Sequence, residues 1–115
     1  MGNAGLIHVL FVCSMNERRS LTGETVFARE NGLSVRSAGT VRGARRTLSA
    51  EDIDWADLVL VMEARHRDRV LNRFGDQIGE TPLHVLDVPD LYPFMDEALV
   101  TLLRERAGPL IWPSP

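Results

Sequence analysis

The sequence predicts an α/β fold in three layers, in which helices cover both faces of a four-stranded parallel sheet. Short apolar runs alternate along the chain with longer segments whose apolar residues recur every three or four positions, which is the pattern of repeated β–α units. The runs are rich in Val, Leu and Ile, as expected for parallel strands that are buried on both faces. At 115 residues, the chain is expected to form one domain that spans residues 1–115.

Strands are predicted for residues 6–12, 33–37, 56–62 and 82–86. The first and third are almost continuously apolar, and the second alternates apolar with polar residues. His8 in the first strand is interpreted as a core or edge residue and His84 in the fourth as a surface residue. Neither histidine is therefore assigned to a site.

Helices are predicted for residues 19–31, for a short segment that begins at Ser49, for residues 63–74 and for a segment that begins at Asp96. Ser49 and Asp96 are residue types that cap helix N-termini. Gly75 is expected to end the third helix, and Glu63 to pair with Arg67 one turn along it. Gly108 and Pro109 are expected to end the last helix, so residues 109–115 are predicted to be a loose tail.

The composition excludes several classes of protein. A hydrophobic content of 44% and a charged content of 25% are those of an ordinary soluble globular domain. The net charge of -3 argues against nucleic-acid binding, and no apolar run approaches the roughly 20 residues of a membrane helix. One cysteine cannot form an internal disulfide, which fits a cytoplasmic protein and makes a cysteine-based zinc site improbable. No metal or organic cofactor is implied.

The residues between the first strand and the first helix have the spacing of a phosphate-binding loop. Cys13 is followed by five residues, then by Arg19 and Ser20. A loop of this length can surround a tetrahedral anion with backbone N–H groups, to which the helix N-terminus adds its positive end. The arginine fork can bind two phosphate oxygens, and a serine hydroxyl can donate to a thiolate.

This loop resembles the catalytic loop of the low-molecular-weight protein tyrosine phosphatases. Asn16 and Ser20 match residues of that family, and the segment Ser37-Ala-Gly-Thr40 matches the end of its second strand. Small residues there allow backbone segments to approach closely. The resemblance covers most of the chain and is closest to a short bacterial branch of the family. It implies a phosphomonoester hydrolase, in particular a protein tyrosine phosphatase, that acts through a phosphocysteine intermediate.

The resemblance assigns roles to residues of this chain. Cys13 is the expected nucleophile, Arg19 the residue that binds the phosphoryl oxygens, and Asp90 the general acid and base. Asp87 is the alternative acid, because the family's Asp-Pro-Tyr motif is matched here only by the Asp and Tyr of Asp90-Leu-Tyr92. The substrate-binding residues implied are Ser14, Met15, Asn16, Glu17, Arg18, Ser20 and Tyr92. Tyr92 would form a wall of the pocket or, alternatively, pack half-buried against the core.

The loop also departs from the family pattern. Met15 replaces the usual glycine, Glu17 introduces a carboxylate, and Leu21 replaces a proline. These departures keep open a phosphate- or phosphoprotein-binding module without turnover. A phosphocarrier is disfavoured by Arg19 and Asp90, and an arsenate reductase by the lack of further cysteines.

The expected partners follow from this chemistry. They are a phosphorylated protein or a small phosphomonoester, together with inorganic phosphate. Neither a nucleic acid nor a membrane is expected as a partner. Arg42, Arg45 and Arg46 form a basic loop that would either steer an anionic substrate or simply be solvated. The sequence does not define the substrate or the oligomeric state.

Overall fold

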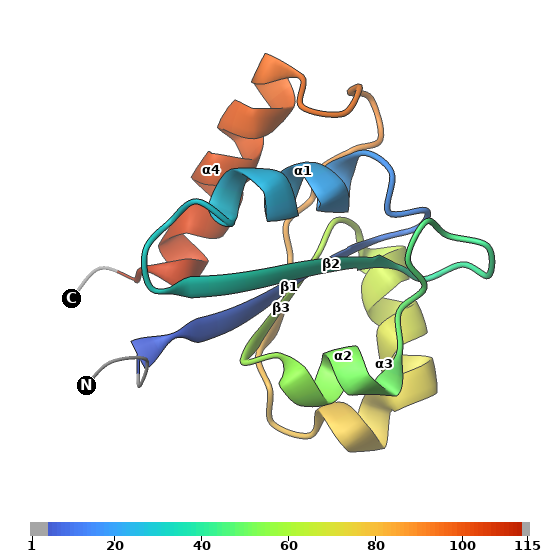
Figure 1. Cartoon of the computed structure of the whole chain (residues 1–115). Coiled ribbons are helices and arrows are strands. Elements are labelled where there is room, and N and C mark those ends of the chain that lie inside the picture. Colours follow the sequence, from blue (N-terminus) through green and yellow to red (C-terminus); the bar gives the residue numbers. More distant parts are fainter. Residues whose placement is uncertain (1–4, 114–115) are drawn as a thin grey trace.

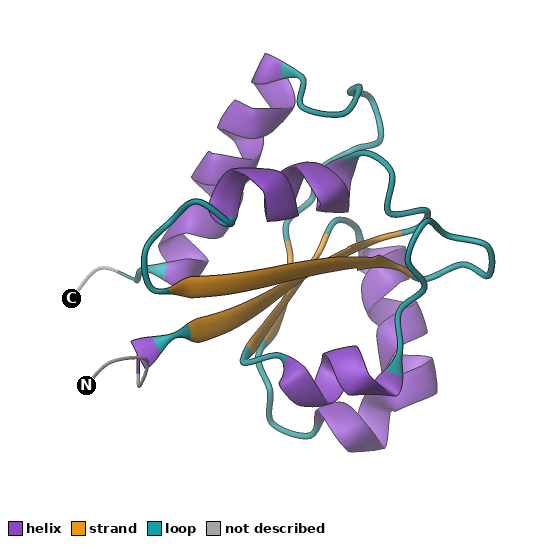
Figure 2. Cartoon of the chain, viewed as in Figure 1, coloured by secondary structure: helices purple, strands orange, loops and turns teal. Residues whose placement is uncertain are grey.

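The four strands form one parallel sheet in the order β2-β1-β3-β4, and Figure 2 shows helices on both sides of the strands. The computed structural model describes residues 5–113. Its elements are β1 Ile7–Cys13, α1 Arg19–Phe27, β2 Leu33–Gly39, α2 Ala50–Trp55, β3 Leu58–Val61, α3 Ala64–Ile78, β4 Leu83–Val85 and α4 Glu97–Ile111. The predicted fold class is therefore confirmed.

Helices α1 and α4 cover one face of the sheet, and α2 and α3 cover the other (Figure 1). Successive side chains of β1 enter the two cores in turn: Val9 and Phe11 pack under α1 and α4, whereas Leu10 and Val12 pack against α2 and α3. This alternation explains why the strand is apolar throughout. Gly23 lets α1 approach closely, since a Cβ there would lie 2.8 Å from the Phe11 ring.

Two helices continue past the residues that were predicted to end them. Helix α3 bends at Phe74 and runs through Gly75 to Ile78, and α4 runs through Pro109 to Ile111. In each case the final apolar side chain is buried in a core, so its packing offsets the weak helix propensity of Gly or Pro. The prediction of a loose tail is therefore wrong for residues 109–111, and residues 114–115 lie outside the described part of the chain.

The first helix is shorter than predicted, because α1 ends at Phe27. The chain then turns, with the Glu30 N–H bonded to the Phe27 carbonyl at 3.0 Å, and reaches β2 through Gly32 at a φ of 85°. His8 is half-buried, and its ring stacks on Trp55 at 4.6 Å between centroids. His84 is exposed, as predicted.

The order of the strands defines where a site can form. The chain adds β2 to one side of β1 and β3 to the other, so the order reverses at β1. In open parallel sheets, ligands bind at the carboxyl ends of the strands beside such a reversal. The residues that follow β1 are those of the loop that begins at Cys13.

Candidate active site

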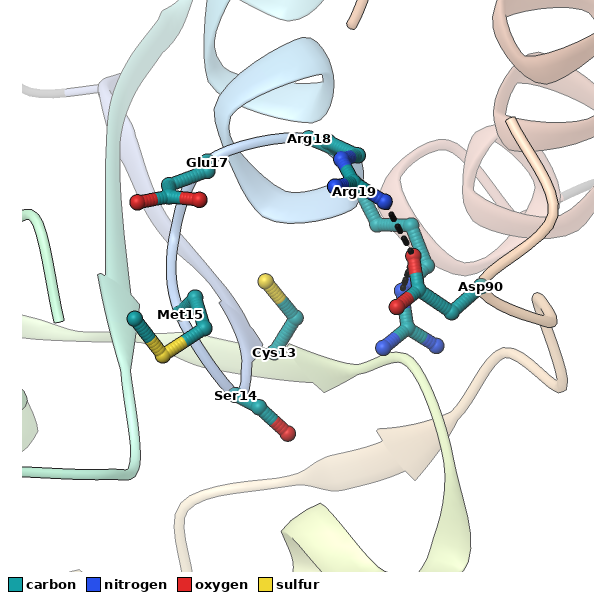
Figure 3. Close-up of a pocket in the computed structure, with 7 residues that line it drawn as sticks. All are labelled: Cys13, Ser14, Met15, Glu17, Arg18, Arg19 and Asp90. Carbon is teal, nitrogen blue, oxygen red and sulfur yellow. Dashed lines mark ion pairs between the residues drawn. The ribbon is translucent and has the colours of Figure 1, made fainter. Parts of the chain in front are cut away.

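A pocket lies at the carboxyl end of β1, between the loop that leads into α1 and the segment that follows β4 (Figure 3). Its lining residues are Cys13, Ser14, Met15, Glu17, Arg18, Arg19 and Asp90. Asp90 is far from the loop in sequence, yet its carboxylate points toward Arg18 and Arg19 in Figure 3. The predicted loop and the predicted late acid therefore meet in one pocket.

The sulfur of Cys13 is surrounded by hydrogen-bond donors. The Asn16 N–H donates to Sγ at 3.3 Å, and Ser20 Oγ lies 3.0 Å from it. Asn16 Nδ2 donates to Ser20 Oγ at 2.7 Å, so the serine hydroxyl accepts there and is free to donate its own proton to the sulfur. Asn16 has a φ of 59°, which asparagine adopts more readily than most residues. The sulfur therefore lies within hydrogen-bond distance of a backbone N–H and of a hydroxyl group.

Asn16 and Ser20 do not line the pocket themselves. Both are fully buried, and they act on the pocket through the sulfur of Cys13. Their side chains are therefore not placed to contact a substrate, and the Asn16 backbone N–H is the group of these two residues that remains as a candidate for such a contact. Asn16 Oδ1 is buried and has no hydrogen-bond partner among residues 5–113.

Arg19 is held at the pocket by groups from two other segments. Its side chain is only 3% exposed and forms an ion pair with Glu63. Its Nη1 also donates to the Val88 carbonyl at 2.8 Å, and its Nε lies 3.8 Å from Asp90 Oδ1. An arginine held on several sides presents its remaining N–H groups in a fixed orientation.

Glu63 was not predicted to belong to the site. The expected pair with Arg67 does not form, because Glu63 is the N-cap of α3 with extended backbone rather than a residue inside the helix. Arg67 instead pairs with its neighbour Asp68. Burial alone would raise the pKa of Glu63, but hydrogen bonds from Arg19 and Arg65 lower it on balance. Glu63 is therefore held as a carboxylate beside Arg19.

His66 is a second residue that the sequence did not reveal. Its Nδ1 accepts the Glu63 N–H at 3.0 Å, so the neutral ring carries its proton on Nε2 and donates to Ser14 Oγ at 2.9 Å. Burial, together with the charge of Arg19 and other arginines, lowers the pKa of His66 to about 4. The ring therefore remains neutral near pH 7 and fixes the Ser14 hydroxyl, which can still donate its proton.

The structure separates the two candidate acids. Asp90 lines the pocket, and its Oδ1 lies 3.7 Å from Arg18 Nη1. Asp87 is exposed and is not among the lining residues. Of the two predicted acids, Asp90 is the one that lies at the pocket.

Tyr92 lies outside the pocket. It is half-buried and packs against the core under α1 and α4. This contradicts the prediction that it forms a wall of the pocket and matches the alternative of a packing residue. Met15 and Glu17 do line the pocket, and in Figure 3 both extend on the side of Cys13 away from Asp90.

The three arginines of the predicted basic loop differ in their surroundings. Arg46 donates to the Ser37 carbonyl at 2.9 Å and pairs with the buried Asp52. Arg45 binds the loop after β1, where its Nε donates to the Asn16 carbonyl at 3.0 Å. Arg42 is exposed.

Within residues 5–113, no group of three or more His, Cys, Asp and Glu residues is placed to hold a metal ion. In the same part of the chain, every helix is too short or too polar to cross a membrane.

Comparison of whole structures relates this architecture to solved proteins. The YwlE arginine phosphatase from Geobacillus stearothermophilus is 23% identical, with a TM-score of 0.68 over 91% of this chain and 93% of that one. SP-PTP, a low-molecular-weight protein tyrosine phosphatase from Streptococcus pyogenes, is 15% identical, with a TM-score of 0.75 over 92% and 91% of the two chains. This chain has the fold of the low-molecular-weight protein tyrosine phosphatases.

A further example of that fold is the tyrosine phosphatase Wzb from Escherichia coli K30, solved in complex with phosphate. It is 20% identical, with a TM-score of 0.71 over 91% of this chain and 96% of that one. No protein-family model and no curated protein matches this chain by sequence. The resemblance inferred from the loop is therefore confirmed as a likeness to the low-molecular-weight phosphatases in fold.

Proposed function

We propose that this protein hydrolyses phosphomonoesters through a phosphocysteine intermediate on Cys13. The observation that carries the proposal is the meeting of three groups in one pocket: a buried thiol with donors at 3.0 and 3.3 Å, a fixed arginine and an aspartate. The low-molecular-weight phosphatase fold of the chain supports it. A reduced cysteine nucleophile suits the cytoplasm, to which we assign the activity.

In the first step, the Cys13 thiolate attacks phosphorus in line with the leaving oxygen. An S–P bond forms and the P–O bond to the leaving group breaks, while Arg19 and the loop N–H groups bind the equatorial oxygens. Glu63 and the Val88 carbonyl orient Arg19 for this task. Asp90, in its protonated form, supplies the proton that the leaving alkoxide or phenoxide needs.

In the second step, water attacks the phosphocysteine. Asp90, now a carboxylate, accepts a proton from that water, the O–P bond forms and the S–P bond breaks. Phosphate leaves, and the sulfur returns to a thiolate that the Ser20 hydroxyl and the Asn16 N–H stabilise. The cycle consumes one water and restores Asp90 to its protonated form.

Phosphotyrosine on a protein is the first candidate substrate. Met15 lines the pocket and is 41% exposed, so an apolar surface is available to an aromatic leaving group. Low-molecular-weight phosphatases of the same fold are described as tyrosine phosphatases.

Phosphoarginine is the second candidate, and Glu17 is the observation that favours it. Phosphoarginine is a phosphoramidate and not an ester, so in the first step its P–N bond would break as the S–P bond forms, and Asp90 would give its proton to the leaving guanidine nitrogen. The Glu17 carboxylate lines the pocket, and no ion pair involves it within residues 5–113. A carboxylate there opposes an anionic phosphate, unless the substrate also carries a positive guanidinium that offsets it. YwlE, of the same fold, is an arginine phosphatase.

A phosphate-binding module without turnover is the alternative from a different functional class. Met15 and Glu17 favour it, since both stand in the loop that would hold the anion. The two functions differ in one measurable respect, because only the enzyme releases phosphate from a bound ester.

Hydrolysis of p-nitrophenyl phosphate between pH 5 and 7 tests the proposal. The native protein is compared with Cys13→Ser and Asp90→Asn, and with Asp87→Asn as a matched control for the acid. We expect Cys13→Ser to abolish turnover, Asp90→Asn to slow it by about 100-fold or more, and Asp87→Asn to leave it unchanged. Tight phosphate binding by a native protein that is no faster than Cys13→Ser would support the binding module instead.

A further inference from the structure

The loop that carries Cys13 is bonded along its outer side to the segment that follows β2. Four consecutive carbonyls, those of residues 13–16, each accept a hydrogen bond from residues 40–45. The Thr40 N–H donates to the Cys13 carbonyl at 2.9 Å, and the Val41 N–H donates to the Ser14 carbonyl at 3.1 Å.

Arg45 supplies the other two of these hydrogen bonds. Its backbone N–H donates to the Met15 carbonyl at 2.9 Å, and its side-chain Nε donates to the Asn16 carbonyl at 3.0 Å. Three of the four carbonyls thus accept a hydrogen bond from a backbone N–H, whereas the Asn16 carbonyl accepts one from a side chain.

The hydrogen bonds on the outer side determine what faces the inner side. In a planar trans peptide, the carbonyl of one residue and the N–H of the next point in opposite directions. Carbonyls that face residues 40–45 therefore turn the N–H groups of residues 14–17 toward the other side of the loop. One of these is seen directly, since the Asn16 N–H reaches Cys13 Sγ at 3.3 Å.

We propose that Arg45 is a positioning residue of the anion site, whose Nε hydrogen bond turns the Glu17 N–H toward a bound phosphate. The inference rests on the proposed function, because the phosphate is the group that this N–H would contact. Asn16 adopts a φ of 59°, a conformation that costs free energy for a residue with a side chain. A contact at its carbonyl helps to hold the peptide in that conformation.

Two glycines, Gly39 and Gly43, allow the backbone to place Arg45 beside the Cys13 loop. Gly39 has no Cβ, and one there would lie 2.5 Å from the Ser14 carbonyl oxygen, so β2 can end directly against the loop. Gly43 has a φ of 88° within a turn in which the Ala44 N–H donates to the Val41 carbonyl at 3.1 Å. This turn brings both donors of Arg45 back to the loop.

Steering of an anionic substrate by charge is the competing explanation for arginines in this segment. Arg42 provides the comparison, because it stands in the same turn and, like Arg45, is exposed. Within the described residues, no hydrogen bond joins it to the Cys13 loop. Steering predicts similar effects for both arginines, whereas positioning predicts an effect for Arg45 alone.

The test measures the reactivity of Cys13 and therefore does not depend on turnover. Iodoacetamide alkylation of the full chain is followed from pH 5 to 9, with and without inorganic phosphate as a protecting ligand. The variants are Arg45→Met, which keeps an apolar stem but removes the donor, Arg45→Lys, which keeps the charge without the planar Nε donor, and Arg42→Met as the control. Thermal unfolding of each variant is recorded in parallel.

For Arg45→Met and Arg45→Lys, we expect alkylation of Cys13 at pH 6 to slow about fivefold. The phosphate concentration that gives half-maximal protection should rise about fivefold, because one hydrogen bond is lost. Arg42→Met should match the native protein, and all four proteins should unfold at similar temperatures. The proposal is overturned if Arg45→Met matches Arg42→Met, or if Arg45→Lys matches the native protein. Alkylation can be measured even if the native protein has no phosphatase activity. Such a lack of activity would contradict the proposed function, whereas the alkylation result would still test the role of Arg45.

Discussion

Arg19 and Glu63, which are 44 residues apart in the chain, form an ion pair at the edge of the pocket that contains Cys13. Arg19 belongs to the first turn of α1, and Glu63 is the N-cap of α3 on the other side of the sheet. The pair therefore joins the two helical layers at the site. It also orients the guanidinium that would bind the phosphoryl oxygens.

Replacing Glu63 should affect catalysis more than stability. In Glu63→Gln, Arg19 keeps the Val88 carbonyl and the more distant Asp90 but loses the carboxylate that contacts its Nη1, so its orientation relaxes. We expect kcat/KM for p-nitrophenyl phosphate to fall at least tenfold, and the free energy of unfolding by about 1–2 kcal/mol, since Glu63 is one-third exposed. Steady-state kinetics and urea unfolding measure the two effects. Asp68→Asn, which removes an exposed ion pair, should change neither, and equal kinetics for the two variants would contradict the role of Glu63.

His66 should make stability depend on pH between about 4 and 6.5. Its pKa lies at about 4 in the folded chain and at 6.5 in a free side chain, so the unfolded chain binds more protons across this range. The free energy of unfolding should therefore fall as the pH decreases from 7 to 4, by up to about 3 kcal/mol. Urea unfolding of the native protein and of His66→Gln measures this. The variant should lose this part of the slope, and identical slopes would rule out a neutral buried histidine.

Asp52 should be a main contributor to stability away from the pocket. It is fully buried and accepts from Arg46 and from the Ser49 N–H at 3.1 Å; burial alone would raise its pKa, but these donors lower it on balance. Asp52→Ala leaves Arg46 without its carboxylate and removes half of a capping box, so we expect a loss of about 3 kcal/mol by urea unfolding. Asp54→Ala, at an exposed position of the same helix, should change stability by less than about 0.5 kcal/mol. A loss no greater than that of the control would contradict this assignment.

Gly39 should tolerate no side chain, whereas Gly75 should tolerate one. A Cβ at Gly39 would lie 2.5 Å from the Ser14 carbonyl oxygen and 2.6 Å from the Ala44 Cβ, while a Cβ at Gly75 would meet nothing within 4 Å. We expect Gly39→Ala to lower the free energy of unfolding by about 1–3 kcal/mol and to slow hydrolysis, because the loop must shift. Gly75→Ala should keep native activity and match or exceed native stability. Native activity in Gly39→Ala would show that the loop position is not constrained from this side.

Sequence reasoning was most successful where the signal is local. The apolar run of β1, the capping pattern at Ser49 and the spacing of Cys13 and Arg19 each lie within a few residues, and each is found where it was predicted. The small residues that end β2 were predicted to allow close approach of the backbone, and Gly39 confirms this. Local patterns therefore sufficed for the fold and for the side of the pocket that the loop provides.

The residues that contact the Cys13 loop from other parts of the chain could not be predicted from local patterns. Glu63, His66 and Arg45 reach the loop only through the tertiary fold, and the chain holds 16 acidic residues and 13 basic ones from which pairs could be chosen. Helix ends were also misjudged at Gly75 and Pro109, because burial of Ile78 and Ile111 outweighs local propensity. Tyr92 follows the predicted acid by two residues, yet the chain turns it toward the core.

The most direct test of the account is to look for the phosphoryl group on Cys13 itself. The native protein is mixed with p-nitrophenyl phosphate, quenched within a single turnover, and analysed by intact and peptide mass spectrometry. The account predicts a transient mass increase of one phosphoryl group, located on Cys13, that persists longer in Asp90→Asn because hydrolysis of the intermediate is slowed. Hydrolysis that proceeds with no phosphorylated Cys13, or that continues unchanged in Cys13→Ser, would contradict it.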